Sequence, residues 1–158
     1  MLKLILTTAL LLALIAPAQA ADKSPSPNQI LGGKAAASSS GSGNFYSGNG
    51  SYAGRISTNG LSTSEYNGQG SYVGRIERSK NDARIYDGKG SYAGRASTSG
   101  NGTSYYDSKG SYSGRSSSSG NTTSFYDRSG AYSGRAVESG GTTSFYDSSG
   151  RFVGRKGR

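Results

Sequence analysis

A twenty-residue repeat constrains the fold of this chain more than any other feature of its sequence. Its clearest copy, Phe145–Arg155, reads aromatic, Tyr, Asp, two small or polar residues, Gly, any residue, aromatic, any residue, Gly, Arg. The pattern recurs every twenty residues, in copies that begin at Phe125, Tyr105 and Ile85 and in looser copies that begin at Glu65 and Phe45. Because almost every aromatic residue falls on this lattice, the repeat predicts the architecture.

The repeat organises residues 44–158 into one domain. A partial unit, 44–50, precedes five full units, 51–70, 71–90, 91–110, 111–130 and 131–150, and the segment 151–158 closes the series. A helical fold is excluded because Gly and Ser occur throughout and the apolar residues do not recur at spacings of three and four. A twenty-residue unit cannot bury an aromatic face alone, so neighbouring units must pack against each other.

Each unit predicts a β-hairpin. In one unit the expected strands are Thr122–Tyr126 and Ala131–Arg135, joined by the turn Asp127–Gly130. Asp suits the first turn position because its side chain accepts backbone N–H groups, and Gly suits the last because it adopts positive φ. The return connection, Ser117–Asn121, is expected to be a second turn.

The turn also predicts a strand register. We expect Tyr126 opposite Tyr132 and Phe125 opposite Ser133, with the further pairs Ser124–Gly134 and Thr123–Arg135. Continued along the chain, such hairpins give an all-β fold, an antiparallel meander or short solenoid with about two strands per repeat. In this open ribbon the last strand has an unprotected edge.

The segment before the repeats has the features of an export signal and a linker. Residues 1–20 combine Lys3, an apolar run from Leu4 to Ile15 and the small-residue motif Ala18-Gln19-Ala20, which predicts a signal peptide cleaved after Ala20. Residues 21–43 are rich in Ser, Pro, Ala and Gly and predict a disordered linker. We therefore expect an exported bacterial protein, located in the periplasm, secreted or held at the cell surface.

Composition excludes most catalytic chemistry. The chain has no His and no Cys, so it lacks the usual ligands of a zinc site and the parts of a thiol or Ser-His nucleophile. Single carboxylates spaced twenty residues apart match neither a calcium loop nor the acid pair of a glycosidase. The sequence therefore predicts no enzymatic activity, no catalytic residues, no metal site and no cofactor.

The candidate binding residues are basic and aromatic. The formal net charge of +9 favours anionic partners. Guanidinium groups at a regular period suit a polymer that carries repeated anionic groups, and Tyr rings offer faces for sugars or bases. The candidates are Arg55, Arg75, Arg95, Arg115, Arg135, Arg155, Tyr92, Tyr112 and Tyr132. Two alternatives remain open: that each Arg pairs with a nearby turn Asp, and that the Tyr residues form the core.

The repeat resembles two families of bacterial surface proteins. The stretch Phe145–Arg151 resembles the YD repeats of large surface and toxin-delivery proteins. The twenty-residue period with paired aromatics is similar to choline-binding and glucan-binding repeats. The first resemblance implies strands that form a β-rich shell, and the second implies a solenoid of β-hairpins. Choline-binding repeats hold their ligand with Trp, which this chain lacks, so we carry over the hairpin architecture and no binding residues.

The leading interpretation is an exported, non-enzymatic repeat protein that serves as an envelope or extracellular structural or binding module. Its expected partner is an anionic polysaccharide or another cell-envelope polymer. One alternative is self-assembly into surface fibres, in which the unprotected last strand pairs with the next molecule. Another is binding of nucleic acid, since Gly-Arg with Tyr also suits single strands.

Overall fold

The computed structural model describes residues 41–157, which form an all-β fold. The strands are β1 (Gly41–Ser47), β2 (Tyr52–Asn59), β3 (Ser62–Asn67), β4 (Tyr72–Arg78), β5 (Asp82–Asp87), β6 (Tyr92–Ser99), β7 (Gly102–Asp107), β8 (Tyr112–Ser119), β9 (Thr122–Asp127), β10 (Tyr132–Ser139), β11 (Thr142–Asp147) and β12 (Phe152–Gly157). The expected signal peptide and the linker up to residue 40 lie outside the described residues. Residues 41–157 include no helix long and apolar enough to cross a membrane.

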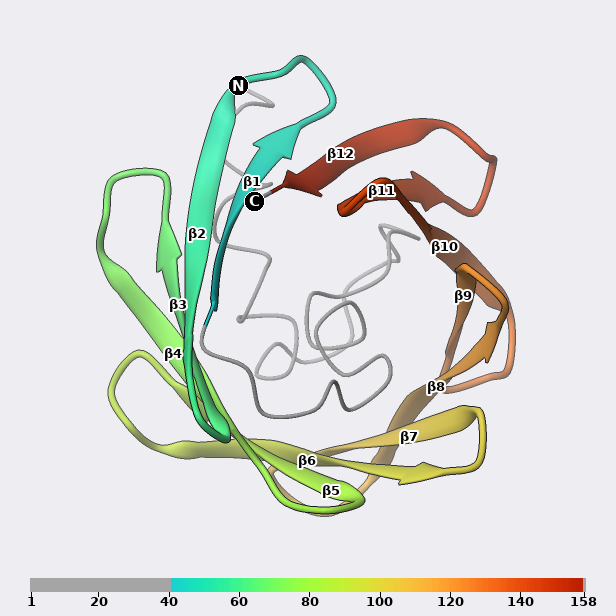
Figure 1. Cartoon of the computed structure of the whole chain (residues 1–158). Coiled ribbons are helices and arrows are strands. Elements are labelled where there is room, and N and C mark those ends of the chain that lie inside the picture. The colour runs from blue at the N-terminus through green and yellow to red at the C-terminus, as the bar shows by residue number, and fades with distance from the viewer. Residues whose placement is uncertain (1–40, 158) are drawn as a thin grey trace.

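The strands form a closed antiparallel barrel (Figure 1). Each strand pairs with its neighbours in the chain, and β12 pairs with β1, with Asn44 opposite Gly157 and Tyr46 opposite Arg155. The prediction of an all-β antiparallel meander of hairpins is confirmed. The prediction of an open ribbon with an unprotected last strand is wrong, because the two partial units at the ends of the domain supply β1 and β12, which together complete a further unit.

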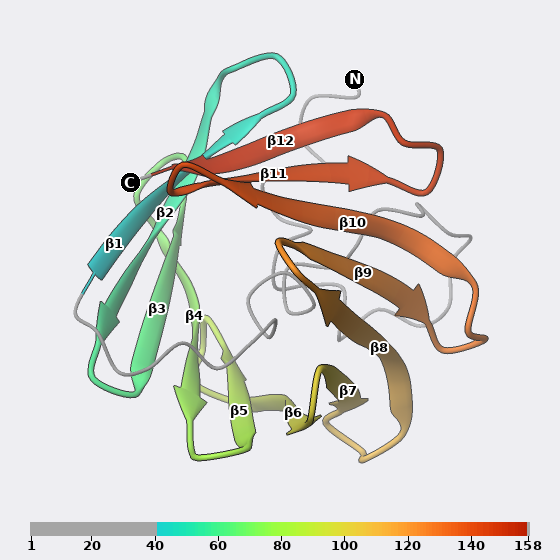
Figure 2. The ribbon, with the colours of Figure 1, turned by 45° about the vertical axis from the view of Figure 1, so that its right-hand side comes forward.

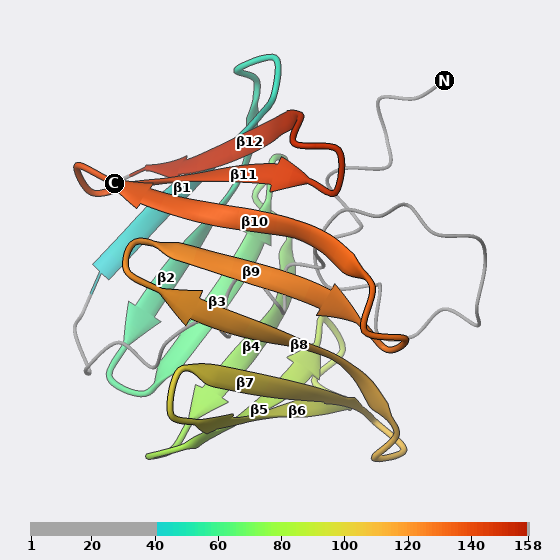
Figure 3. The same ribbon diagram turned by 90° about the vertical axis from the view of Figure 1, so that its right-hand side faces the viewer.

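Side views show how the hairpins stand next to one another around the barrel (Figures 2 and 3). From β1 onward, successive hairpins turn around a common axis until β12 lies beside β1. The first strand begins at Gly41, three residues before the predicted start of the repeat domain. These residues pair with β2, where Gly43 lies opposite Ile56.

The turn predicted at Asp127–Gly130 is present six times, with Ser47 and Asn67 in place of Asp in the first two copies. At Asp107, the side-chain Oδ1 accepts hydrogen bonds from the backbone N–H groups of Lys109 and Ser111, both at 2.9 Å. The N–H of Gly110, whose φ is 83°, donates to the carbonyl oxygen of Asp107 at 3.0 Å. The second turn is shorter than predicted, because Ser117–Ser119 belong to β8 and only Gly120 and Asn121 connect it to β9.

A β-bulge after each Asp turn sets the register. Tyr126 lies opposite Tyr132, as predicted, but the register then shifts so that Phe125 faces Gly134. The predicted pairs beyond Tyr132 (Phe125–Ser133, Ser124–Gly134 and Thr123–Arg135) are therefore wrong by one residue: Ser124 faces Arg135 and Thr123 faces Ala136. Ser133 is the extra residue of the bulge, which the turn sequence alone does not reveal.

The bulge determines which positions of the repeat point into the barrel and which point outward. Positions within a unit are counted here from its first residue, so that Arg55 is at position 5 and Tyr66 at position 16 of the unit 51–70. The positions buried most regularly are 4, 6 and 15, exemplified by Gly114, Ser116 and Phe125. Positions 5 and 16 alternate with them and point outward, because successive side chains in a strand point to opposite faces.

The interior is packed by residues of complementary size. Position 6 faces position 15 across the paired strands, in the pairs Ile76–Ile85, Ala96–Tyr105, Ser116–Phe125 and Ala136–Phe145. Where position 6 is Ala or Ser, position 15 is aromatic, and where position 6 is Ile in the unit 71–90, position 15 is Ile, so a small residue always faces a large one or two medium residues face each other in these pairs. The hydroxyl of Tyr105 also forms a hydrogen bond of 2.9 Å with Ser116. Such compensation lets dissimilar units share one wall.

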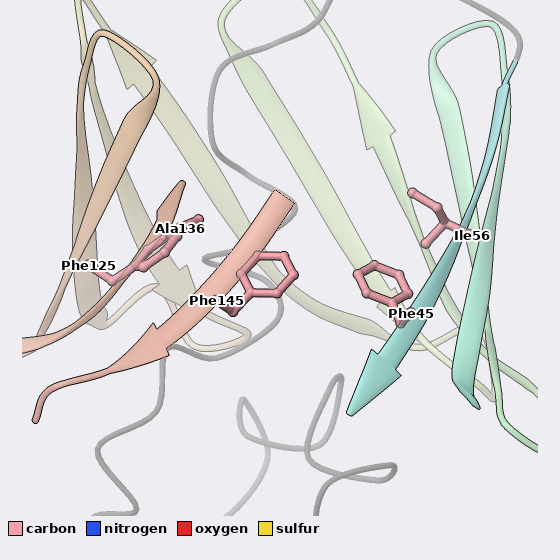
Figure 4. Packing of buried hydrophobic residues seen from close by; sticks show 5 residues of the cluster. All are labelled: Phe45, Ile56, Phe125, Ala136 and Phe145. Atoms are coloured by element: carbon pink, nitrogen blue, oxygen red, sulfur yellow. The ribbon is translucent and has the colours of Figure 1, made fainter. Parts of the chain in front are cut away.

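The main apolar cluster joins the two ends of the domain (Figure 4). Phe45 of β1 lies 6.5 Å from Phe145 of β11, measured between ring centroids. Phe125, which has no exposed surface, belongs to the same cluster, as do Ile56 and Ala136. This packing across the β1–β12 seam supports closure in addition to the backbone hydrogen bonds.

The Gly at position 4 is required by the bulge. A Cβ atom on Gly54 would collide with the carbonyl oxygen of Tyr66, and on Gly154 it would lie 2.5 Å from the carbonyl oxygen of Tyr46. Both residues have φ near +150° (148° and 156°), which L-residues rarely adopt. The close approach of the two backbones at this point therefore explains a Gly in every unit.

Replacing one of these glycines should destabilise the barrel. We expect Gly54→Ala to lower the free energy of unfolding by about 2 kcal/mol or more, because it adds a steric collision to an unfavourable φ. Gly102→Ala is the matched control, since a Cβ atom there meets its nearest atom at 3.6 Å. Urea denaturation followed by tyrosine fluorescence measures both variants. Equal losses of stability would contradict this account of the bulge.

Candidate functional site

Each of the six Arg residues at position 5 lies over the ring of a Tyr on the neighbouring strand. The distance from Cζ to the ring centroid ranges from 4.0 Å for Arg55 over Tyr66 to 5.4 Å for Arg155 over Tyr46. The other pairs are Arg75–Tyr86, Arg95–Tyr106, Arg115–Tyr126 and Arg135–Tyr146. Register explains the contact, because these residues lie directly opposite each other, as Arg115 and Tyr126 do. Cation–π contacts of this kind each stabilise by about 0.5–1 kcal/mol at exposed sites.

Each stacked Tyr also contacts a second aromatic ring on its other side. Tyr106 and Tyr112, for example, meet edge to face with centroids 6.1 Å apart and an interplanar angle of 75°. These second rings are 37–44% exposed and are Tyr52, Tyr72, Tyr92, Tyr112, Tyr132 and Phe152. We call the six groups of one Arg, one stacked Tyr and one exposed aromatic the belt.

Closure of the barrel makes the belt continuous. The contact of Arg155 with Tyr46 crosses the seam between β12 and β1, and Tyr46 in turn contacts Tyr52 of β2 at 6.1 Å. The Arg residues lie on the even-numbered strands, from β2 to β12, so they are spaced around the whole circumference. The straight row of Arg expected along one edge of an open ribbon is thus a ring.

The belt charges are mostly not neutralised by carboxylates. Among residues 41–157 the ion pairs are Arg75–Glu77 at 2.8 Å and Arg151–Asp147 at 2.9 Å. The turn Asp residues instead accept backbone hydrogen bonds, as Asp87 does from Lys89 and Ser91. The alternative that the Arg series pairs with the turn Asp residues is therefore wrong. Five belt residues, Arg55, Arg95, Arg115, Arg135 and Arg155, form no ion pair in this part of the chain.

Local hydrogen bonds lower the pKa of two turn carboxylates, Asp127 and Asp147. The hydroxyl of Ser129 donates to Asp127 at 2.6 Å, and this bond is the main cause of a lowered pKa for Asp127. The backbone N–H of Ala131 adds to the effect. The Asp side chains thus have a structural role at one end of the barrel and do not form part of the belt.

All nine residues singled out from the sequence lie in the belt. The six Arg residues are its cations, and Tyr92, Tyr112 and Tyr132 are three of its exposed aromatics. The alternative that the Tyr ladder forms the core is wrong, because the buried large residues are Phe45, Ile56, Ile76, Ile85, Tyr105, Phe125 and Phe145. Of the twelve Tyr residues of the chain, Tyr105 alone is buried in the described core.

Stacking of Arg on Tyr was not predicted from the sequence. Its signal is the spacing between Arg at position 5 and Tyr at position 16 of the same unit, as in Arg95 and Tyr106. The expected second turn, Ser117–Asn121, hides this signal, since the shorter turn at Gly120 and Asn121 is what places Arg115 opposite Tyr126. With the bulge included, Arg and both Tyr rings share the outer face.

Glu65 is a further feature of the structure that the sequence reasoning missed. It stands at position 15, where the other units have Phe, Ile or Tyr, and it is only 3% exposed. Ile56 and Gly74 lie opposite it, and its Oε2 atom has no hydrogen-bond partner. Burial raises the pKa of Glu65 to about 8. A carboxyl at a core position of the repeat was the available signal.

No protein-family model matches this chain, and no curated protein matches its sequence. The resemblance to YD repeats and to choline-binding and glucan-binding repeats therefore stays a prediction. Within residues 41–157, no group of three or more His, Cys, Asp or Glu side chains is placed to hold a metal ion.

Glu65 should make stability depend on pH. Well below pH 4.5 the carboxyl is neutral in both the folded and the unfolded chain. Between pH 4.5 and about 8 the unfolded chain loses the proton while the folded chain keeps it, so stability falls as pH rises and then levels off. We expect Glu65→Gln to gain on the order of 4 kcal/mol relative to the parent between pH 4.5 and pH 8.

Denaturant titrations of both proteins at several pH values test this prediction. The difference between the two proteins cancels the contribution of groups other than Glu65. Glu138→Gln is the control, because Glu138 is exposed. A constant difference between the parent and Glu65→Gln across this pH range would show that Glu65 is not protonated in the barrel.

Proposed function

We propose that this protein is an exported, non-enzymatic binding module that contacts an anionic polysaccharide or a related cell-envelope polymer through the belt. The observation that carries the proposal is the set of five Arg residues that are stacked on Tyr rings and form no ion pair within residues 41–157. The signal-like composition of residues 1–20 supports export.

Stacking on a Tyr ring orients each guanidinium group so that its N–H donors can bind an anion. A ring below the guanidinium plane occupies one face of the group and leaves its N–H donors at the edge of the plane. Those donors match the two oxygens of a carboxylate, sulfate or phosphate. Because Arg115 already lies 4.1 Å from the ring centroid of Tyr126, less side-chain freedom is lost on binding than for a free Arg side chain.

The exposed aromatics favour a sugar polymer. In each unit the exposed ring follows the stacked Tyr around the wall, as Tyr112 follows Tyr106. An exposed Tyr face and its hydroxyl suit a sugar ring, while the adjacent Arg suits an acidic substituent on that sugar. A single-stranded nucleic acid offers the same two features, and the binding experiment therefore includes it as a competitor.

The closed barrel removes the free sheet edge on which the hypothesis of fibre formation depended. The hypothesis depended on an unpaired last strand, and the backbone of β12 pairs with both β11 and β1. A closed barrel has no edge onto which another strand can add. The formal net charge of +9 also opposes close association of copies.

Binding to immobilised polygalacturonate, which carries one carboxylate per sugar, tests the proposal. The variant replaces Arg55, Arg95, Arg115, Arg135 and Arg155 by Gln. We expect it to lose binding by 100-fold or more, on the order of 3 kcal/mol, because charge-assisted hydrogen bonds contribute about 1.5–3 kcal/mol each. Binding by the parent should weaken steeply as salt rises.

A control variant separates the belt from net charge. It replaces five exposed basic residues outside the belt by Gln, namely Lys80, Arg84, Lys89, Lys109 and Arg128. Both variants lose the same charge and keep Arg75 with its Glu77 partner. Equal losses of binding would contradict a specific role of the belt. Preferential displacement by single-stranded DNA would favour nucleic acid as the partner.

A further inference from the structure

The Arg side chains of the belt point outward on all sides of the barrel. A twelve-stranded barrel with ordinary strand spacing and tilt has a radius of about 11 Å at the backbone. The six belt Arg residues, on alternate strands, are thus separated by about 60° around the axis, and Arg95 of β6 lies on the wall opposite Arg155 of β12. Their guanidinium groups diverge because side chains on the outer face radiate from the axis.

An extended polymer cannot follow this ring. A straight segment lying against the wall meets about two neighbouring Arg residues, and those on the opposite wall face away from it. Turning an Arg toward a distant chain also breaks its contact with a Tyr ring, as at Arg95, which lies 4.1 Å from the ring centroid of Tyr106. A single polymer chain therefore leaves part of the belt open.

The belt units are also separated by uncharged surface. The outward residues at positions 7 and 14 are mostly Ser, such as Ser97, Ser104, Ser117 and Ser124. The exception is the unit 71–90, where Glu77 forms an ion pair with Arg75 at 2.8 Å and Arg84 lies at position 14. Arg75 is thus the one belt cation with a carboxylate partner among the described residues, and five units remain open on the rest of the wall.

We propose that one molecule of this protein binds two or more chains of an acidic polysaccharide at once and cross-links them. The inference rests on the proposed function of the belt and adds the arrangement of the partners. The closed barrel acts as a rigid hub, with separate binding units on separate walls. A second polymer chain is bound by the same kind of contacts as the first, because the barrel places further Arg residues on another wall.

Two variants that each keep three belt Arg residues test the inference. The one-wall variant, Arg55→Gln/Arg75→Gln/Arg155→Gln, keeps the neighbours on β6, β8 and β10. The spread variant, Arg75→Gln/Arg115→Gln/Arg155→Gln, keeps Arg residues on β2, β6 and β10, which are evenly distributed around the ring. The two proteins have the same charge and differ only in whether Arg115 or Arg55 remains.

Light scattering with long polygalacturonate measures cross-linking, and calorimetry with hexagalacturonate measures binding to a single chain. We expect the parent to cross-link the polymer at intermediate ratios and to disperse it at large excess of protein. The one-wall variant should bind hexagalacturonate about ten-fold more tightly than the spread variant, because two of its Arg residues reach one chain. The spread variant should cross-link more strongly than the one-wall variant.

Opposite orders in the two measurements are the signature of the proposal, since net charge affects both variants equally. A parent protein that binds polygalacturonate but never raises its scattering overturns the cross-linking inference and leaves the proposed function standing. Equal behaviour of the two variants in both measurements overturns it as well. A parent protein that binds neither the long nor the short ligand overturns the proposed function itself.

Discussion

The pairing of β1 with β12 is the constraint on which the other features depend. Without it the twelve strands form a ribbon with two free edges, and the partial units at its ends lack half of their partners. With it, every strand has two neighbours, Phe45 packs against Phe145 across the seam, and Arg155 stacks on Tyr46. Closure thus completes the backbone hydrogen bonding, the apolar core and the belt together.

The bulge after each Asp turn gives the repeat its two faces. It requires a Gly at position 4, where the neighbouring backbone approaches too closely for a Cβ atom. It also moves Arg and Tyr to the outside while Phe125 and its equivalents stay inside. Six copies of this local arrangement build a wall with an apolar interior and a cationic, aromatic exterior. The small and large residues at positions 6 and 15 compensate each other inside it.

Much of this could be predicted from the sequence, and the failures have physical causes. Hairpins and Asp-Gly turns follow from local preferences, and the pairing of Tyr126 with Tyr132 follows from the turn. The shift beyond Tyr132 could not be predicted, because a bulge depends on how two backbones approach. Closure could not be predicted either, since the register between β1 and β12 joins residues more than a hundred positions apart, as in Asn44 and Gly157. The belt residues were found by their periodicity, but their stacking and the buried Glu65 depend on which face each residue occupies.

The distance between the two ends of the sheet tests the closed barrel most directly. The chain has no Cys, so spin labels can be attached at Asn44→Cys and Gly157→Cys alone. These residues lie opposite each other in the register of β1 and β12, which places their Cα atoms about 5 Å apart and predicts strong dipolar broadening of the electron spin resonance spectrum. In an open ribbon of twelve strands the labels would be about 50 Å apart and the broadening would be absent. That second result would contradict closure and, with it, the continuous belt.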